Sequence, residues 1–410
     1  MTTPEIIPQI QVTLDCNLRC TYCFQKHARG VIPLSVVQAI LEMVVSESLS
    51  TVPVSSSSQK RDIALTWHGG EPLMAGVEFF REVIRLQSGF AGIRFVNQVQ
   101  TNATLMTKEL ATLFCDHEFQ VGFSLDGPED IHNRHRVFNG SEHGSFSQTM
   151  KGIEIFRGVS DKEHLPVIAV ITRDSINSAD EIFYFFRKLK ARVQLDIYDI
   201  RCLDMAGDDM EKPDVFRLAP APHAVGEFLI RLFDLWFHDN SGRVDFPELR
   251  SEIKMILQPE MDKGDPFHKK RCSLGRLIFA PDGNAFSCDQ YVNDEHTSLG
   301  DIKETGLKEI LTKKAALWEE IKRRIRGSGR EMACSKCEWG HRHSGGCLSC
   351  MKYNLMLLGA RKKGLPDSQW IYAGLPLFLD QIKGETYYCE GLNAFRTHAK
   401  KKILEEMTDA

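Results

Sequence analysis

Several features of exported, membrane-bound and nucleic-acid-binding proteins are missing from this sequence. Residues 1–9 contain no charged segment followed by a long apolar stretch, so we expect no signal peptide. No apolar run approaches the roughly 20 residues that a membrane-spanning helix needs. The net charge of −4 provides no overall basic surface for nucleic acid or anionic lipid. We therefore expect a cytoplasmic protein with no nucleic-acid partner and no membrane partner.

The chain also lacks a solenoid-type repeat, and its composition is that of an ordinary globular protein, with 42% hydrophobic and 26% charged residues. Its 410 residues predict two or three domains. Cysteine, by contrast, is plentiful, with 12 residues. In a cytoplasmic chain, clustered cysteines indicate metal ligands rather than disulfides.

The first two thirds of the sequence alternate short apolar segments with longer amphipathic ones. This alternation predicts parallel β–α–β units, whose functional loops gather at the carboxyl ends of the strands. A Ser-rich loop is expected at 48–59 and an irregular segment at 204–222. The expected strands are 10–13, 63–67, 94–100, 120–125, 167–171 and 193–200, and the expected helices are 33–46, 76–87, 107–115, 145–157 and 224–237.

Three cysteines, Cys16, Cys20 and Cys23, follow the first expected strand in the motif C-N-L-R-C-T-Y-C. Three thiolates at this spacing can bind three irons of a [4Fe–4S] cluster and leave the fourth iron open to a small molecule. The simpler alternative is a set of structural thiols or a zinc knuckle. Further motifs follow in order, each close to the end of an expected strand: W-H-G-G-E-P at 67–72, Q-T-N at 100–102 and S-L-D-G-P at 124–128.

This order of motifs resembles the radical SAM superfamily. The resemblance implies a partial (β/α)6 TIM-barrel core in which the open iron binds S-adenosylmethionine (SAM). One electron then cleaves SAM to methionine and a 5′-deoxyadenosyl radical, which abstracts a hydrogen atom from the substrate.

The resemblance also implies SAM-binding residues. The G-G-E-P turn is expected to bind the methionyl amine, and Asn102 and a polar residue after the fourth strand are expected to lie near SAM. One arginine of H-N-R-H-R is expected to pair with the SAM carboxylate. An aromatic side chain is expected to stack on adenine. A plain turn, solvated arginines and a packing role for the aromatic ring are the respective alternatives. The candidate residues are Phe24, Gly69, Gly70, Glu71, Pro72, Asn102, Ser124, Asp126, Arg134 and Arg136.

A second set of cysteines lies in the last third of the chain. Its spacing, C-x(10)-G-x4-C, then C-x2-C and a late cysteine, resembles the SPASM extension, which in its full form holds two auxiliary [4Fe–4S] clusters. A zinc ribbon is the alternative. The candidate ligands are Cys272, Cys288, Cys334, Cys337, His343, Cys347, Cys350 and Cys389.

This set departs from the SPASM pattern. His343 stands where the pattern has a cysteine, Cys350 is additional, and only His268 precedes Cys272 where a further ligand is often found. Either His343 or Cys350 is expected to complete one cluster. The other would rest on three cysteines, with an open iron or with His268. A neutral histidine ligand would raise the reduction potential of its cluster.

We expect a radical SAM barrel at 1–240, a bridging region at 241–265, a SPASM domain at 266–390 and a C-terminal helix at 391–410. The helix is basic with an acidic end, and we expect it to be solvated.

Radical SAM–SPASM enzymes mostly modify peptides and proteins, and two branches compete here. The motifs favour a maturase that abstracts a hydrogen, expected at Cβ, from a ribosomally made precursor peptide and oxidatively modifies or crosslinks it, as cyclophane-forming enzymes do. The alternative is an anaerobic sulfatase-maturating enzyme, which converts Cys or Ser to formylglycine and in which Asp289 would be the catalytic base. A non-catalytic iron–sulfur electron carrier is the alternative of another class. The expected partners are a peptide or protein substrate, a flavodoxin- or ferredoxin-type reductant and a separate leader-recognition protein.

Overall fold

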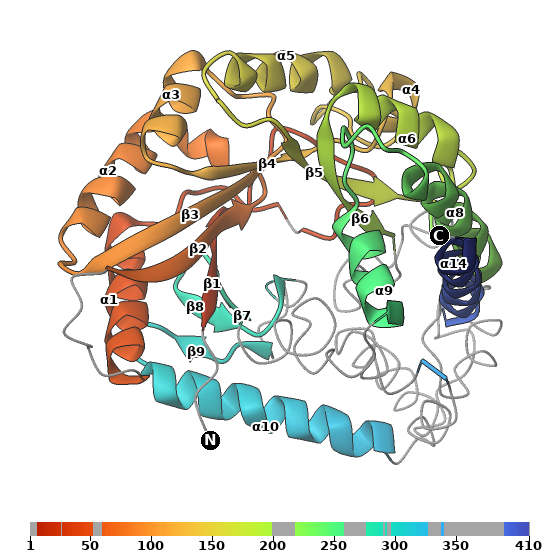
Figure 1. Cartoon of the computed structure of the whole chain (residues 1–410). Helices are drawn as coiled ribbons and strands as arrows, with labels where there is room; N and C mark the ends of the chain where they lie inside the picture. Colours follow the sequence, from red (N-terminus) through yellow and green to blue (C-terminus); the bar gives the residue numbers. More distant parts are fainter. Residues whose placement is uncertain are drawn as a thin grey trace, which may run out of the picture. The chain divides into compact units, whose positions relative to one another are not determined.

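The computed structural model of the chain describes residues 6–25, 27–51, 60–198, 218–257, 276–289, 292, 297–326, 338–339 and 389–409. These residues belong to two units (Figure 1). Unit 1 comprises 1–125, 132–166 and 273–316, and unit 2 comprises 126–131, 167–272 and 317–410. In the described part of the chain, no helix combines the length and the apolarity needed to cross a membrane.

Unit 1 is built on four parallel strands that carry the residues of the G-G-E-P and cysteine motifs at their carboxyl ends. The strands lie in the order β4-β3-β2-β1 and alternate with helices, of which α1, α2 and α3 cover the outer side of β1–β3 (Figure 1). Buried apolar side chains such as Val12, Leu65 and Trp67 hold the two layers together. The elements are β1 (Ile7–Thr13), α1 (Leu34–Thr51), β2 (Arg61–Gly69), η1 (Pro72–Ala75), α2 (Gly76–Ser88), β3 (Ile93–Thr101), α3 (Lys108–Asp116), β4 (Gln120–Ser124) and α5 (Phe146–Arg157).

Three further strands extend this sheet beyond β1. Strand β7 (Arg276–Phe279) pairs parallel with β1, and β8 (Asn284–Phe286) and β9 (Gly300–Asp301) follow antiparallel. The β7–β8 hairpin thereby brings Cys288 and Asp289 next to the strand that leads into the N-terminal cysteine motif. Helix α10 (Leu307–Arg326) comes after β9.

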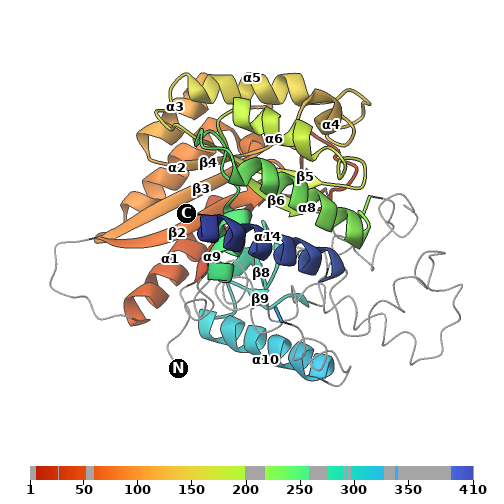
Figure 2. The same cartoon turned by 45° about the vertical axis from the view of Figure 1, so that its right-hand side comes forward.

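Unit 2 contains the remaining strands and most of the later helices. Strand β5 (Leu165–Ile171), which begins at the end of unit 1, leads to α6 (Ala179–Lys188) and β6 (Ala191–Ile197). Helices α8 (Pro222–Phe237), α9 (Pro247–Leu257) and α14 (Cys389–Asp409) follow, and the short α4 (Glu129–Asn133) lies between β4 and α5. Figure 2 shows α14 beside α8.

The expectation of a solvated C-terminal helix is wrong. Helix α14 buries Phe395, Ala399 and Ile403, which share one helical face. Its backbone approaches α8 so closely that a Cβ added to Gly391 would lie 2.0 Å from the carbonyl oxygen of Pro222. The apolar stripe and the small residue both indicate helix–helix packing, which the basic composition of the segment obscured.

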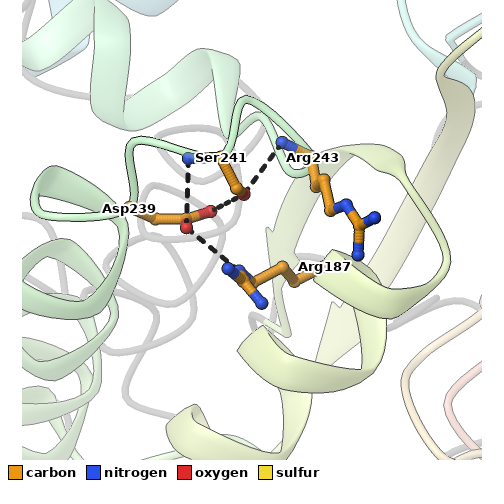
Figure 3. Close-up of polar contacts among 4 residues, drawn as sticks. All are labelled: Arg187, Asp239, Ser241 and Arg243. Atoms are coloured by element: carbon orange, nitrogen blue, oxygen red, sulfur yellow. Dashed lines mark hydrogen bonds and ion pairs between the residues drawn. The ribbon is translucent and has the colours of Figure 1, made fainter.

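The turn after α8 is held by a compact set of polar contacts (Figure 3). The carboxylate of Asp239 accepts hydrogen bonds from Arg187 Nε at 3.0 Å and from Ser241 Oγ at 2.7 Å. The hydroxyl of Ser241 in turn accepts from the backbone N–H of Arg243 at 3.2 Å. These contacts attach the turn to α6.

The six expected strands and five expected helices are all present, with ends that differ by a few residues. Residues 48–51 of the expected Ser-rich loop form the last turn of α1 instead, and 52–59 lie outside the described residues. The expected segment 204–222 overlaps the start of α8 at its end, and 204–217 lie outside the described residues. The strand–helix order agrees with the predicted partial-barrel core.

Candidate functional site

The three N-terminal cysteines lie on one loop that begins where β1 ends. Cys16 and Cys20 are half-buried and Cys23 is exposed. The sulfur of Cys16 accepts a hydrogen bond from the backbone N–H of Leu18 at 3.3 Å, and the N–H of Cys23 donates to the carbonyl of Cys20 at 2.9 Å. These local bonds give the loop its shape.

The donor set fits an iron–sulfur cluster. Burial and the neighbouring Glu71 raise the pKa of the Cys16 thiol, so a metal has to displace its proton on binding. Among the described residues, no three His, Cys, Asp or Glu side chains come together as ligands of a single metal ion. A [4Fe–4S] cluster makes no such demand, because each thiolate binds a different iron.

The G-G-E-P turn lies directly against the start of the cysteine loop. The N–H of Gly70 donates to the carbonyl of Thr13 at 2.8 Å, and the N–H of Glu71 donates to the carbonyl of Asp15 at 2.9 Å. A Cβ added to Gly70 would lie 2.0 Å from the Asp15 carbonyl oxygen, and Gly69 has a φ of 126°. Both glycines are therefore required by the close backbone contact and the left-handed conformation.

Glu71 connects this turn to the end of β3. Its carboxylate accepts hydrogen bonds from Leu73 N at 2.9 Å, Thr101 Oγ1 at 2.6 Å and Asn102 N at 2.7 Å. Burial raises the pKa of Glu71 to about 7, against the opposing effect of these hydrogen bonds. Glu71 thus has a structural role in addition to the predicted contact with the SAM amine, and Thr101 is a partner that sequence reasoning did not single out.

Asn102 reaches from β3 to the cysteine loop. Its Nδ2 lies 2.9 Å from Asn17 Oδ1 and 3.8 Å from Cys16 Sγ, and Asn17 Nδ2 donates to Thr104 Oγ1 at 2.7 Å. Asn17 was missed by the sequence analysis, although its place between Cys16 and the next cysteine is a usable signal. Asn102 therefore links the cysteine loop and the G-G-E-P turn.

The two polar residues at the end of β4 have different surroundings. Ser124 Oγ accepts a hydrogen bond from Gln100 Nε2 at 3.0 Å. Asp126 is buried and its Oδ1 accepts from the backbone N–H of Val170 on β5 at 2.9 Å, within unit 2. The predicted contacts of both residues with SAM remain predictions, but Asp126 also has a clear role in holding β5.

The two arginines of H-N-R-H-R differ in exposure. Arg134 is exposed, whereas Arg136 is buried and lies over the ring of Tyr22, 5.5 Å from its centroid. Tyr22 belongs to the cysteine loop, so Arg136 is the arginine that packs beside the cluster site. Phe24, the predicted adenine neighbour, is half-buried.

Asp289 lies beside His68, a residue the sequence analysis did not include among the candidates. Burial raises the pKa of Asp289, but Arg276, His68, the Cys288 thiol and Gln9 together hold it below its ordinary value. Burial lowers the pKa of His68, and Asp289 opposes that effect only in part. The Cys288 thiol donates to Asp289 Oδ1 at 3.3 Å.

Two of the predicted auxiliary ligands are described by the structure. Cys288 is half-buried after β8 in unit 1, and Cys389 is buried at the first residue of α14 in unit 2. The other candidates lie outside the described residues: His268, Cys272, Cys334, Cys337, His343, Cys347 and Cys350.

Comparison with known proteins agrees with this site. The model of the radical SAM superfamily matches residues 10–183, and that of the SPASM iron–sulfur cluster-binding domain matches residues 272–338. A cysteine-type anaerobic sulfatase-maturating enzyme of Clostridium perfringens is 27% identical over 82% of this chain and 86% of its own length. A serine-type anaerobic sulfatase-maturating enzyme of Bacteroides thetaiotaomicron is 28% identical over 72% of this chain and 72% of its own length.

Solved structures share the fold. The structure of native anSMEcpe with bound AdoMet has a TM-score of 0.73, with 21% identity over 99% of this chain and 100% of that chain. Streptococcus suis SuiB bound to S-adenosylmethionine has a TM-score of 0.56, with 15% identity over 86% of this chain and 75% of that chain. The predicted radical SAM core with a C-terminal SPASM domain is confirmed. The chain is thus a radical SAM enzyme with a SPASM domain, and its cofactors are SAM, a SAM-binding [4Fe–4S] cluster and further iron–sulfur clusters of the SPASM domain.

Proposed function

We propose that this enzyme oxidises the Cβ of a cysteine or serine residue in a protein or peptide, converting the side chain to the aldehyde of formylglycine. The observation that carries the proposal is Asp289, whose carboxylate accepts a hydrogen bond from Cys288, a predicted ligand of an auxiliary cluster, and lies beside the imidazole of His68. The similarity to both cysteine-type and serine-type sulfatase-maturating enzymes, over more than two thirds of each chain, supports it.

In this proposal, Cys16, Cys20 and Cys23 hold the cluster that binds SAM, and the G-G-E-P turn orients the methionyl end. When bound, the SAM cluster supplies the electron that cleaves SAM to a hydrogen-abstracting radical, and the auxiliary clusters supply an acceptor for the second electron. Residue Asn102 keeps the SAM turn and the cysteine loop in register through its bonds to Glu71 and Asn17.

Asp289 takes the proton of the reacting thiol or hydroxyl. Because Arg276 and His68 hold its pKa below the ordinary value, the carboxylate is ionised at neutral pH and ready to accept a proton. The substrate then loses one hydrogen atom, one proton and one further electron, which together amount to a two-electron oxidation of Cβ. From serine this gives the aldehyde directly; from cysteine it gives a thioaldehyde, which water hydrolyses to the aldehyde with release of hydrogen sulfide.

Crosslinking or other oxidation of a ribosomally made precursor peptide is the second candidate. The sequence motifs favour it, and His68 stands where sulfatase-maturating enzymes usually have glutamine before the two glycines. The similarity to SuiB is one of fold, whereas the similarity to sulfatase-maturating enzymes extends to sequence. We therefore treat crosslinking as the second candidate. Both candidate functions require a reductant, for which we propose a flavodoxin- or ferredoxin-type protein. Only the second candidate function would involve a separate leader-recognition protein.

The test is mass spectrometry of anaerobic reactions of the reconstituted enzyme with SAM and a reductant. One reaction contains a sulfatase-type peptide with Cys or Ser, and the other an aromatic-rich precursor peptide. An aldehyde at Cys or Ser supports the proposal. Loss of two hydrogens from the aromatic peptide alone, with cyclic fragmentation, supports the second candidate and contradicts the first. The Asp289→Asn variant should still form 5′-deoxyadenosine but should lose most of the aldehyde.

A further inference from the structure

Besides Nε2 of Gln9, four polar atoms on the inner side of unit 1 have no hydrogen-bond partner within the part of the chain that the structure describes. They are Oε1 and Nε2 of Gln11, Nδ1 of His68 and Oγ of Ser287. Gln11 is 0% and Ser287 1% exposed, so bulk water does not reach them. An unpaired buried polar group costs about 1–3 kcal/mol, so buried polar groups are nearly always paired. Gln11 therefore has no partner among the residues that the structure describes, and a bound molecule could supply one.

The position of Gln11 places that partner at the reaction site. Gln11 on β1 is in register with His68 on β2, directly before the G-G-E-P turn. A Cβ added to Gly69 would lie 3.3 Å from Gln11 Oε1, so the carboxamide lies against the first glycine of that turn.

The same face of β1 leads to Asp289. Gln9, two residues before Gln11, points to the same side of the sheet and its Oε1 accepts a hydrogen bond from Arg276. Gln9 also lies next to the carboxylate of Asp289. Gln11 thus lies between the SAM-binding turn and the proposed base, where the reacting residue of the substrate has to be.

The chemistry of a carboxamide narrows the choice of ligand. Gln11 offers both donors and an acceptor at once. A residue in an extended peptide presents its N–H and its C=O to the same side, as in a hydrogen-bonded pair of an antiparallel sheet. One carboxamide can bind both groups, whereas a cation or an anion would use only half of it.

We infer that Gln11 binds the main-chain N–H and C=O of a substrate residue next to the oxidised side chain, and that Nδ1 of His68 contributes a further hydrogen bond. Gln11 is then a positioning residue that fixes the peptide relative to SAM. The inference rests on the proposed function only in that the substrate is a peptide, and it applies equally to a Cys/Ser substrate and to a precursor peptide.

The first test compares the thermal stability of the cluster-loaded enzyme with that of two variants. Gln11→Met removes an unpaired amide, so its melting temperature should equal or exceed that of the wild type. Gln87→Met is the matched control, because the buried amide of Gln87 pairs with Asn97 at 2.8 and 2.9 Å and its loss should lower the melting temperature. If Gln11→Met is destabilised as much as Gln87→Met, the amide already has a partner, such as a trapped water, in the free enzyme and the inference is overturned.

The second test measures anaerobic binding of a Cys-containing sulfatase-type peptide to the SAM-loaded enzyme, by fluorescence anisotropy. Peptides with single backbone N-methyl groups around the Cys are compared in the wild type, Gln11→Met and Gln87→Met. One N-methyl position should weaken binding to the wild type and to Gln87→Met about tenfold, the worth of one or two hydrogen bonds. The same peptide should show no such loss with Gln11→Met.

The outcomes separate the inference from the proposed function. Equal N-methyl penalties in all three proteins, with normal aldehyde formation, overturn the inference and leave the function intact. A penalty that depends on Gln11, without aldehyde formation, supports the inference and contradicts the function. If neither the sulfatase-type peptide nor an aromatic-rich precursor peptide binds to the wild type, both are overturned.

Discussion

The backbone N–H of Asn102 donates to the carboxylate of Glu71 at 2.7 Å, while its side chain lies 3.8 Å from the sulfur of Cys16. One residue at the end of β3 therefore touches both the predicted SAM-binding turn and a predicted cluster ligand. Hydrogen bonds to cluster sulfurs and their ligands influence both the potential and the geometry of the cluster.

Replacing Asn102 with alanine should lower the reduction potential of the SAM-binding cluster, because a hydrogen-bond donor that stabilises the reduced cluster is lost. Formation of 5′-deoxyadenosine should fall roughly tenfold or more, as for other residues that orient metal ligands. Anaerobic redox titration followed by EPR measures the first effect. Asn97→Ala is the control, since Asn97 is buried on the same strand but bonds Trp67 and Gln87. An unchanged potential in Asn102→Ala would rule out the contact with Cys16.

Substitution of Gly70 by alanine should prevent SAM binding while leaving the clusters in place. The added Cβ would lie 2.0 Å from the Asp15 carbonyl, so the turn has to move away from the cysteine loop. Isothermal titration of SAM into the reconstituted protein, with an iron count, would show this. Gly306→Ala is the matched control because no atom lies within 4 Å of the added Cβ. Normal SAM affinity in Gly70→Ala would mean that the turn does not hold SAM.

The buried ion pair between Arg396 of α14 and Glu252 of α9 should be essential for the stability of unit 2. Its two hydrogen bonds measure 2.8 and 2.9 Å, and the side chains are 4% and 9% exposed. Arg396→Ala leaves a buried carboxylate without a partner and should reduce the free energy of unfolding by about 3–5 kcal/mol. Removal of the exposed Arg231, which pairs with Asp180, should lower the free energy of unfolding much less, because solvent screens an exposed pair. Urea denaturation measures the free energy of unfolding of both variants. Equal decreases in the two variants would contradict the importance of the buried ion pair.

Glu248 of α9 should make the enzyme less stable as the pH rises through neutrality. Burial and the nearby Asp245 and Asp196 raise its pKa to about 7, above its ordinary value of 4.5. The folded-state pKa is thus the higher one, so the contribution of Glu248 to stability is complete below pH 4.5 and is lost as the pH rises through 7.

The variant Glu248→Gln should therefore match the wild type near pH 5 and exceed it by about 1–3 kcal/mol at pH 8. Denaturant unfolding at the two pH values measures the difference. The exposed Glu154, replaced by Gln, should produce no such change. A constant difference between Glu248→Gln and the wild type across this range would refute the role of Glu248.

Local sequence signals were sufficient for the parallel core. Strands such as Ile93–Thr101 and helices such as Gly76–Ser88 carry their own apolar periodicity and turn residues, so their order could be predicted. Strand β7 could not, because its four residues are paired with β1, which lies far away in the sequence. The burial of Arg396 likewise depends on Glu252, a partner that no local pattern identifies.

The site shows the same division. The spacing of Cys16, Cys20 and Cys23 and the two glycines of the G-G-E-P turn indicate their chemistry directly. The proximity of His68 to Asp289, by contrast, depends on the β7–β8 hairpin and could not be predicted from local sequence. That the amide of Gln11 lacks a hydrogen-bond partner can be recognised only from the three-dimensional structure. Sequence motifs favoured a crosslinking maturase, whereas sequence similarity over 82% of the chain favours the sulfatase-maturating branch.

The central claim is that a SAM-derived radical removes a hydrogen from Cβ of a peptidyl Cys or Ser. It is tested most directly with a sulfatase-type peptide that carries deuterium at Cβ of that residue, incubated anaerobically with the reconstituted enzyme, SAM and a reductant. The account predicts that one deuterium appears in 5′-deoxyadenosine for each aldehyde formed. Formation of 5′-deoxyadenosine without deuterium, and without an aldehyde on the peptide, would contradict it.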